Sequence, residues 1–264
     1  MGFYSTRKYN IILPIFVIFT LLLSSSCSND KKQDIELIAH AGGEIEGHIY
    51  TNSLEAIKQS IERGYKYIEI DLALTADSVL VAVHDWEEFN RITGNPHKKD
   101  TIPSLEEFQQ RIIHGKYTPL TAEQINQIFI DNETLYLVTD KISNPEILEQ
   151  NFPNLKQRMV VEAFNYPEYN ILCSQGYFRV LYSRLASDFR RGIEDHLLLH
   201  FLHRGHKIKW IATHPGAFQY GILRAASIFT DFNFAIYTIN NWNDIPQKDY
   251  GRTKMIYTDR IVPQ

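Results

Sequence analysis

The chain has 264 residues, of which 44% are hydrophobic and 22% charged, a composition that excludes an intrinsically disordered protein. The formal net charge is −4 and the isoelectric point is near 6.2. Because there is no basic surplus to neutralise a phosphate backbone, we expect no nucleic acid as a partner.

The N-terminal segment has the order of an export signal. Arg7 and Lys8 precede an apolar run from Ile11 to Leu23, and three serines and Cys27 follow it. The run is too short to span a bilayer, which takes about 20 apolar residues. The order of basic, apolar and small residues is typical of secretory signal peptides. Residues 1–27 are therefore predicted to be a signal peptide.

The small residues that end at Cys27 resemble a bacterial lipobox, although Ser24 stands where leucine is usual. The resemblance implies cleavage before Cys27 and lipidation of its sulfur, with residues 28–34 as a polar tether and residues 35–264 as the folded domain. We therefore expect an exported lipoprotein, anchored in the membrane of the bacterial cell envelope. An uncleaved anchor or a plain signal peptide is the alternative.

From residue 35 onward, short apolar segments alternate with helical patterns. The first strand is expected at Leu37–Gly42, and the apolar spacing then predicts a helix over Asn52–Arg63, with Asn52 as its cap. Further helices are expected at Leu105–Ile113, Ala122–Ile130 and Glu146–Phe152. The later strands are expected at Tyr67–Leu72, Val79–Val83, Leu135–Val138, Met159–Phe164, Phe178–Tyr182, Ile208–Ala212, Phe234–Ile239 and Met255–Tyr257.

Repeated alternation of strands and helices indicates an α/β fold with parallel strands and helical crossovers. Over this length it favours a (β/α)8 TIM barrel, with a doubly wound open sheet as the alternative. The segments give one strand too many for eight, and the pattern does not say which one is surplus.

Two acidic residues stand in the middle of a strand-like segment. Side chains alternate across a strand, so Glu69 and Asp71 share one face while Ile68 and Ile70 share the other. In a barrel the acidic face would point inward, with carboxylates roughly 7 Å apart along the strand. A hard divalent cation would relieve their repulsion. Salt bridges to interior lysine or arginine are the alternative.

Two histidines end neighbouring strands. His40 closes the first strand, and His84 closes the segment Val79–Val83. Both are expected at the C-terminal rim, where barrel enzymes build their sites. The link from Leu72 to Val79 is too short for a helix, but an extended chain could return to the bottom of the barrel. A tight hairpin is the alternative, and it is expected to leave His84 at the wrong end.

The motifs together resemble the glycerophosphodiester phosphodiesterase family, which belongs to the phosphatidylinositol-phospholipase-C-like phosphodiesterases on a (β/α)8 barrel. The family has five motifs in its first part: His-Arg-Gly, Glu-Asn-Thr-Leu-Glu-Ala, Glu-Leu-Asp, Thr-x-Asp-Gly and His-Asp. The chain has similar segments in the same order, namely His40, Asn52-Ser53-Leu54-Glu55-Ala56, Glu69-Ile70-Asp71, Thr75-Ala76-Asp77 and His84-Asp85. Near the end, Tyr237–Asn240 and Ile256–Arg260 resemble two further motifs of the family.

The resemblance implies roles for these residues. His40 and His84 would be the general acid and base, and Glu69 and Asp71 would bind a divalent metal, Mg²⁺ or Ca²⁺. The chemistry is consistent, because a phosphodiester needs its growing negative charge neutralised by a metal. Histidine has a pKa of about 6.5, so one imidazole can accept a proton while the other donates one.

Three departures mark a divergent branch of the family. Ala41 replaces an arginine that ordinarily contacts the phosphate, so another cation or a different substrate is required. The family's Glu-x-Lys is Asp140-Lys141 here: Asp140 is expected as the third metal ligand, and Lys141 as the phosphate cation only if the strand has ended or bulged. Tyr237 replaces a tryptophan and is expected to contact substrate.

Two more residues are candidates for substrate contact. Glu162 lies in a predicted strand and is expected either to face the interior or to form a structural ion pair. Trp86 follows His84-Asp85 and is expected either to line the mouth or to pack on the surface.

These expectations define a phosphoric diester hydrolase that cleaves glycerophosphodiesters to an alcohol and glycerol phosphate. One alternative is a cyclising enzyme similar to phospholipases C and D, or one that acts on envelope glycans. The other is a lipoprotein that binds ligand without catalysis.

Overall fold

The computed structural model of the chain describes residues 35–98, 101–183, 208–215, 232–245, 251 and 253–263. The predicted signal peptide, the tether and Cys27 lie outside these ranges. Among the helices of the described ranges, none has the length and apolar character needed to cross a bilayer.

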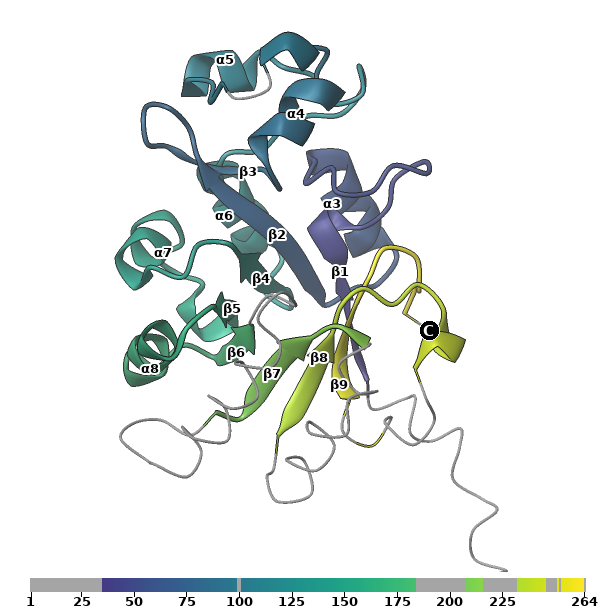
Figure 1. Cartoon of the computed structure of the whole chain (residues 1–264), viewed down its shortest axis with the longest axis vertical. Helices are drawn as coiled ribbons and strands as arrows, with labels where there is room; N and C mark the ends of the chain where they lie inside the picture. The colour runs from purple at the N-terminus through teal and green to yellow at the C-terminus, as the bar shows by residue number, and fades with distance from the viewer. Residues whose placement is uncertain are drawn as a thin grey trace, which may run out of the picture. The chain divides into compact units, whose positions relative to one another are not determined.

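Eight parallel strands close into a barrel (Figure 1). Closure is shown by the first strand, which pairs with the second and also with the last. The barrel strands are β1 (Glu36–Ala39), β2 (Tyr67–Leu74), β4 (Tyr136–Asp140), β5 (Met159–Ala163), β6 (Arg179–Ser183), β7 (Trp210–Thr213), β8 (Asn233–Ile236) and β9 (Thr253–Thr258). The predicted TIM barrel is therefore confirmed, and the open sheet is excluded.

The surplus strand is β3 (Leu80–Ala82), which forms an antiparallel hairpin with β2. The hairpin is the alternative that the short link had left open. The prediction that a hairpin would leave His84 at the wrong end of the barrel is not confirmed, because His84 lies at the mouth. Strand β2 runs past the barrel rim, so the hairpin turn lies above the mouth and β3 returns towards the rim (Figure 1). The amide of Val83 bonds to the carbonyl of Asp71 at 3.0 Å, which brings His84 back to the mouth.

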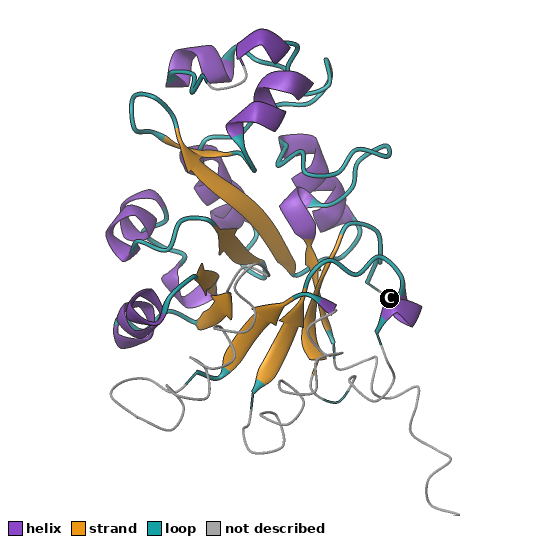
Figure 2. Cartoon of the chain, in the orientation of Figure 1, coloured by secondary structure: helices purple, strands orange, loops and turns teal. Residues whose placement is uncertain are grey.

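Six α-helices and four 3-10 turns are described. Figure 2 shows helices on the outer side of β4, β5 and β6, as the barrel requires, and two further helices beyond the β2–β3 hairpin. The α-helices are α3 (Leu54–Glu62), α4 (Trp86–Ile92), α5 (Leu105–Gln109), α6 (Ala122–Asp131), α7 (Pro145–Asn151) and α8 (Tyr166–Ser174). The turns are η1 (His40–Gly42), η2 (Pro96–Lys98), η3 (Lys156–Arg158) and η6 (Trp242–Asp244).

The cap of α3 differs from the prediction. Ser53 is the N-cap, and its side chain accepts a hydrogen bond from the amide of Ala56. Asn52 lies one residue earlier, with a positive φ of 48°, and its amide side chain bonds to Asp71 instead. The sequence does place a capping residue there, but two adjacent residues can cap and their backbone angles decide between them.

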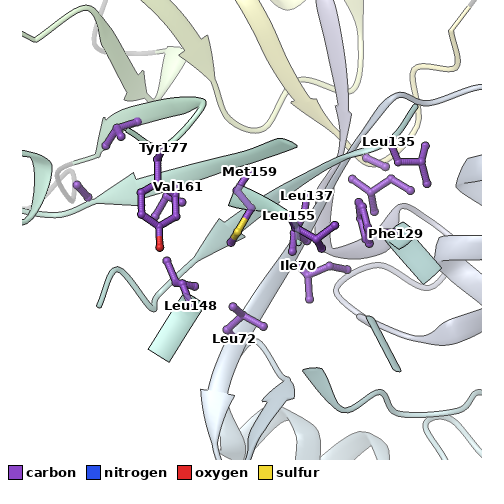
Figure 3. Close-up of a cluster of buried hydrophobic side chains, with 14 of the residues drawn as sticks. Ile70, Leu72, Phe129, Leu135, Leu137, Leu148, Leu155, Met159, Val161 and Tyr177 are labelled. Atoms are coloured by element: carbon purple, nitrogen blue, oxygen red, sulfur yellow. The ribbon is translucent and has the colours of Figure 1, made fainter. Parts of the chain in front are cut away.

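Alternation along the strands separates two apolar cores. Outward residues such as Ile70, Leu72 and Leu137 pack against the helices around Phe129 and Leu148 (Figure 3). Inward residues form a second cluster at the lower part of the barrel, composed of Ile38, Tyr67, Val138, Val160, Leu181, Ala212, Ala235, Met255 and Tyr257. The inward apolar layers end near the rim, where the acidic residues of β2 begin.

Truncation of an outward-facing residue will destabilise the barrel. Ile70 is fully buried between β2 and the helices, so Ile70→Ala is expected to lower the free energy of unfolding by about 2–5 kcal/mol through the lost burial and the cavity left behind. Ile112→Ala is the control, since Ile112 is 55% exposed and should change this free energy by at most about 0.5 kcal/mol. Urea denaturation measures both, and equal effects would contradict the assigned core.

Candidate active site

Three carboxylates meet at the C-terminal end of the barrel strands. Glu69 and Asp71 point inward from β2, and Asp140 ends β4. In the parallel register Asp71 lies opposite Asp140, so the two side chains project at the same height. One oxygen from each of the three carboxylates lies within 4.8 Å of the others. The structure thus brings together the three residues that were predicted to bind the metal.

The state of these carboxylates fits a divalent cation. Glu69 is buried, its Oε2 accepts the amide of Ala41 at 2.6 Å, and its Oε1 has no hydrogen-bond partner among the described residues. Burial, followed by the charges of Asp71 and Asp140, raises the pKa of Glu69 well above its ordinary value. Burial and the charge of Asp71 also raise the pKa of Asp140. A hard cation with oxygen ligands would satisfy the unpaired oxygen and remove the repulsion.

His40 lies at the same rim and is backed by a carboxylate. Its Nδ1 is 3.0 Å from Oδ1 of Asp259, which is nearly inaccessible to solvent. Burial acts to raise the pKa of Asp259, but hydrogen bonds from His40 and Asn240 outweigh it, and the pKa lies below the ordinary value. Asp259 is therefore a charged partner, and Nε2 is the ring nitrogen that remains for substrate.

His84 has a similar partner in a different environment. Its Nδ1 is 2.8 Å from Oδ2 of Asp85, but the two side chains are 37% and 47% exposed. Asp85 also caps α4 by accepting the amide of Glu88. Asp85 thus contacts both the histidine and the first turn of α4. Both imidazoles therefore use Nδ1 for a carboxylate, although the pair of His84 is exposed to solvent.

Lys141 reaches the site through its backbone conformation. Strict alternation would turn it away from Asp140, but β4 ends at Asp140 and Lys141 has a positive φ of 69°. Its Nζ donates to the carbonyl of His84 and lies 3.7 Å from Oδ1 of Asp71. The lysine ammonium is thus brought to the carboxylate cluster.

Glu162 faces the barrel interior, which is one of its two expected positions. Its carboxylate accepts the hydroxyl of Tyr257, and it is nearly fully buried. Burial and the charge of Asp140 raise its pKa to about 8. This carboxyl therefore holds its proton more firmly than an ordinary glutamate, and in its protonated form it can donate as well as accept a hydrogen bond.

The two aromatic candidates lie in different surroundings. Trp86 packs edge-on against Phe89 of α4 and Phe108 of α5, with ring centroids 5.7 Å and 6.4 Å apart, in a third apolar cluster to which both helices contribute. Tyr237 lies beside Tyr257, with ring centroids 6.2 Å apart. Burial and the charge of Glu162 raise the pKa of Tyr237 to about 12. Substrate contact stays a prediction for both residues.

Two partners of the site were missed by the sequence interpretation. Asp259 lies in the Ile256–Arg260 motif, directly after β9, and its place at a strand end was the available signal. Asn52 was interpreted only as a cap, yet its Nδ2 donates to Oδ2 of Asp71 at 2.9 Å and its Oδ1 accepts the amide of Asp71 at 3.0 Å.

A parallel barrel with an acidic cluster and carboxylate-backed histidines at its C-terminal mouth has the architecture of an enzyme active site. Comparison with known proteins agrees with this class. Residues 41–175 match the model of the glycerophosphoryl diester phosphodiesterase family. The chain belongs to this family.

Three individual relatives each share less than 30% sequence identity with this chain. A glycerophosphodiester phosphodiesterase from Caldanaerobacter subterraneus is 26% identical over 148 residues, which cover 54% of this chain and 58% of the relative. A solved glycerophosphodiester phosphodiesterase from Parabacteroides distasonis is 19% identical, with a TM-score of 0.61 over 86% of this chain and 93% of that one. A phosphodiesterase from Oleispira antarctica, solved with the product sn-glycerol-3-phosphate, is 19% identical, with a TM-score of 0.56 over 87% and 95%. The two structures establish the shared fold.

Removing one carboxylate should raise the melting temperature of the metal-free protein but reduce the stabilisation that metal provides. The raised pKa of Glu69 means that the folded state holds this proton more tightly than the unfolded state. Metal-free stability therefore falls as pH rises from the unfolded value, about 4.3, towards the raised folded value. At pH 7.5, Glu69→Gln is expected to raise the melting temperature of the metal-free protein and to abolish most of the rise that Mg²⁺, Ca²⁺ or Mn²⁺ gives the wild type.

The wild type should gain about 2.7 kcal/mol when the metal is at 100 times its Kd. Differential scanning fluorimetry with and without metal measures both effects. Glu62→Gln is the control, because Glu62 is exposed on the last turn of α3. A metal response that survives in Glu69→Gln would remove Glu69 from the ligand set.

Proposed function

We propose that the chain is a metal-dependent phosphodiesterase that hydrolyses glycerophosphodiesters to an alcohol and glycerol phosphate. The observation that carries the proposal is the juxtaposition of two carboxylate-backed imidazoles, His40 and His84, with the three-carboxylate cluster at one barrel mouth. Family membership supports the reaction class, and the product named for the Oleispira antarctica structure supports the choice of glycerol phosphate.

The carboxylates Glu69, Asp71 and Asp140 would hold the metal, and Mg²⁺ and Ca²⁺ both prefer such oxygen ligands. When bound, the metal would neutralise charge on the phosphate oxygens. Lys141 supplies a second positive charge beside Asp71, in the role that Ala41 cannot perform. This assignment explains how the site can bind a phosphodiester without the family's arginine.

The two imidazoles divide the proton transfers. One Nε2 accepts a proton from the attacking water as the new oxygen–phosphorus bond forms. The other Nε2 donates a proton to the leaving alcohol oxygen as its bond to phosphorus breaks. Asp259 and Asp85 accept the Nδ1–H of the two rings, so the accepting ring is a neutral imidazole with a free Nε2, and the donating ring is an imidazolium that carries a proton on both nitrogens.

We further propose that the chain is an exported lipoprotein anchored through Cys27. The support is the order of residues 1–27 in the sequence, and the anchor would place the enzyme where lipid headgroups are released.

The activity depends on both histidines and on metal. Full-length protein, stripped of metal, is assayed against a panel of glycerophosphodiesters with Mg²⁺, Ca²⁺ or Mn²⁺ added in turn. His40→Ala and His84→Ala should each lower kcat by about 10²–10⁴-fold, since each removes one proton transfer. His97→Ala is the control, because His97 is exposed on η2.

Release of the alcohol in ¹⁸O-labelled water distinguishes hydrolysis from cyclisation. Hydrolysis places one solvent oxygen in the glycerol phosphate, whereas a cyclic phosphate product contains none. No turnover with any substrate, despite metal-induced stabilisation, would favour a protein that binds ligand without catalysis.

The proposed anchor predicts a change in cell fractionation. Cys27→Ser removes the only sulfur of the lipobox-like segment, so the protein should move from the membrane fraction to the soluble exported fraction. Metabolic labelling with a fatty-acid analogue should mark the wild type only. Cys173→Ser, in the folded domain, is the control. Unchanged membrane association of Cys27→Ser would refute the lipid anchor.

A further inference from the structure

We propose that Tyr50 is a positioning residue that sets the orientation of the His40 and His84 imidazoles relative to each other. Its ring lies 4.6 Å from the ring of His40 and 4.8 Å from that of His84, edge-on to both. One aromatic side chain thus contacts both groups to which the proposed function gives the proton transfers, and the inference rests on that function.

The two histidines differ in how firmly their other partners hold them. Asp259, the partner of His40, is 4% exposed, whereas Asp85, the partner of His84, is 47% exposed. Exposed ion pairs stabilise a geometry only weakly, because water competes for both groups. The contact with Tyr50 therefore matters more for His84, and it couples the less restrained ring to the firmly held ring of His40.

The backbone at Tyr50 is held in an unfavourable conformation. Its φ is +58°, a region that bulky aromatic residues seldom occupy. Its side chain is only partly buried, so packing into a hydrophobic core does not explain the conformation. Strained residues of this kind persist where the surroundings impose them, and they cluster at functional sites.

The segment Glu44–Thr51, called here the Tyr50 loop, is fastened at several points. Ile45 and His48 pair through their backbones, and Glu46 binds Lys116 and the hydroxyl of Tyr117. The next residue after the loop, Asn52, binds Asp71. The ring of Tyr50 therefore stays at the mouth because the backbone on both sides of it is fixed.

The hydroxyl of Tyr50 adds a polar contact to the ring contacts. Burial raises the pKa of this hydroxyl overall, although the side chain of Thr238 lies close enough to lower it, and the hydroxyl of Thr238 lies 3.4 Å from Nδ1 of His40. The ring, in contrast, contacts both imidazoles directly. We therefore assign the positioning to the aromatic ring and only a supporting contact to the hydroxyl.

The test removes the ring without adding strain. Asparagine tolerates positive φ better than other non-glycine residues, so Tyr50→Asn should not lower the melting temperature. Its kcat should fall about 10- to 100-fold, because misplacing a reacting group by about 1 Å can cost that much, while KM changes less than about threefold. Tyr50→Phe keeps the ring and should keep kcat within about threefold of the wild type.

His114→Asn is the matched control for an aromatic ring at positive φ. His114 has a φ of +51°, and its ring stacks on His48 rather than on the two active-site imidazoles. This variant should keep kcat within about twofold of the wild type. An equal loss of kcat in His114→Asn and Tyr50→Asn would mean that the loop as a whole matters, and would overturn the assignment to Tyr50.

NMR signals of the imidazole Cε1–H groups, assigned with the two histidine-to-alanine variants, supply a readout independent of turnover. In Tyr50→Asn the signals of His84 should shift and broaden more than those of His40, whereas in Tyr50→Phe both should stay near the wild type. The proposal is overturned if kcat and the signals are unchanged in Tyr50→Asn, if Tyr50→Phe loses as much activity as Tyr50→Asn, or if the melting temperature falls together with kcat. A wild type without turnover would refute the proposed function, and the NMR comparison would still decide whether Tyr50 positions the rings.

Discussion

The repulsion among three neighbouring carboxylates, two of them buried, is the constraint around which the barrel mouth is organised. Glu69 and Asp71 lie on one strand, β2, and the parallel register of β2 and β4 places Asp140 opposite Asp71. The neighbouring groups reduce the repulsion only in part. The amide of Ala41 bonds to Glu69, Asn52 bonds to Asp71, and Lys141 lies beside Asp71, yet one oxygen of Glu69 stays without a partner among the described residues. A divalent cation with oxygen ligands would satisfy this oxygen, which supports the metal in the proposed function.

Local periodicity made much of the fold and the acidic site predictable. Alternation along β2 is a property of a few consecutive residues, so it gave the inward face of Glu69 and Asp71 before any partner strand was known. All nine strand segments were found because each is a short apolar run between polar turns. Which strand was surplus depended on the length of β2 beyond the rim, and that length is fixed by the pairing of Leu74 with Leu80 rather than by composition.

The parts of the site that escaped prediction depend on backbone conformation outside the strands. Tyr50 and Asn52 both have positive φ and lie outside the strands. Lys141, which was predicted to reach the site only if its strand had ended or bulged, also has positive φ. A sequence pattern indicates such angles reliably for glycine but not for these residue types. Asp259 was missed for another reason, because its partner His40 is 219 positions away and only closure of the barrel brings them together.

Because of the charge at the mouth, binding of the phosphodiester in the proposed reaction would depend on binding of the metal. Of the lysine and arginine side chains that the structure describes, Lys141 is the one that lies against the carboxylate cluster, and one positive charge does not balance three carboxylates. A phosphodiester carries a negative charge of its own and would be repelled by the metal-free site, since electrostatic interactions are strong where water is largely excluded. A divalent cation held by these carboxylates would reverse this field. Because Ala41 offers no positive charge at this mouth, the metal of the proposed function would be needed for substrate binding as well as for the chemical step.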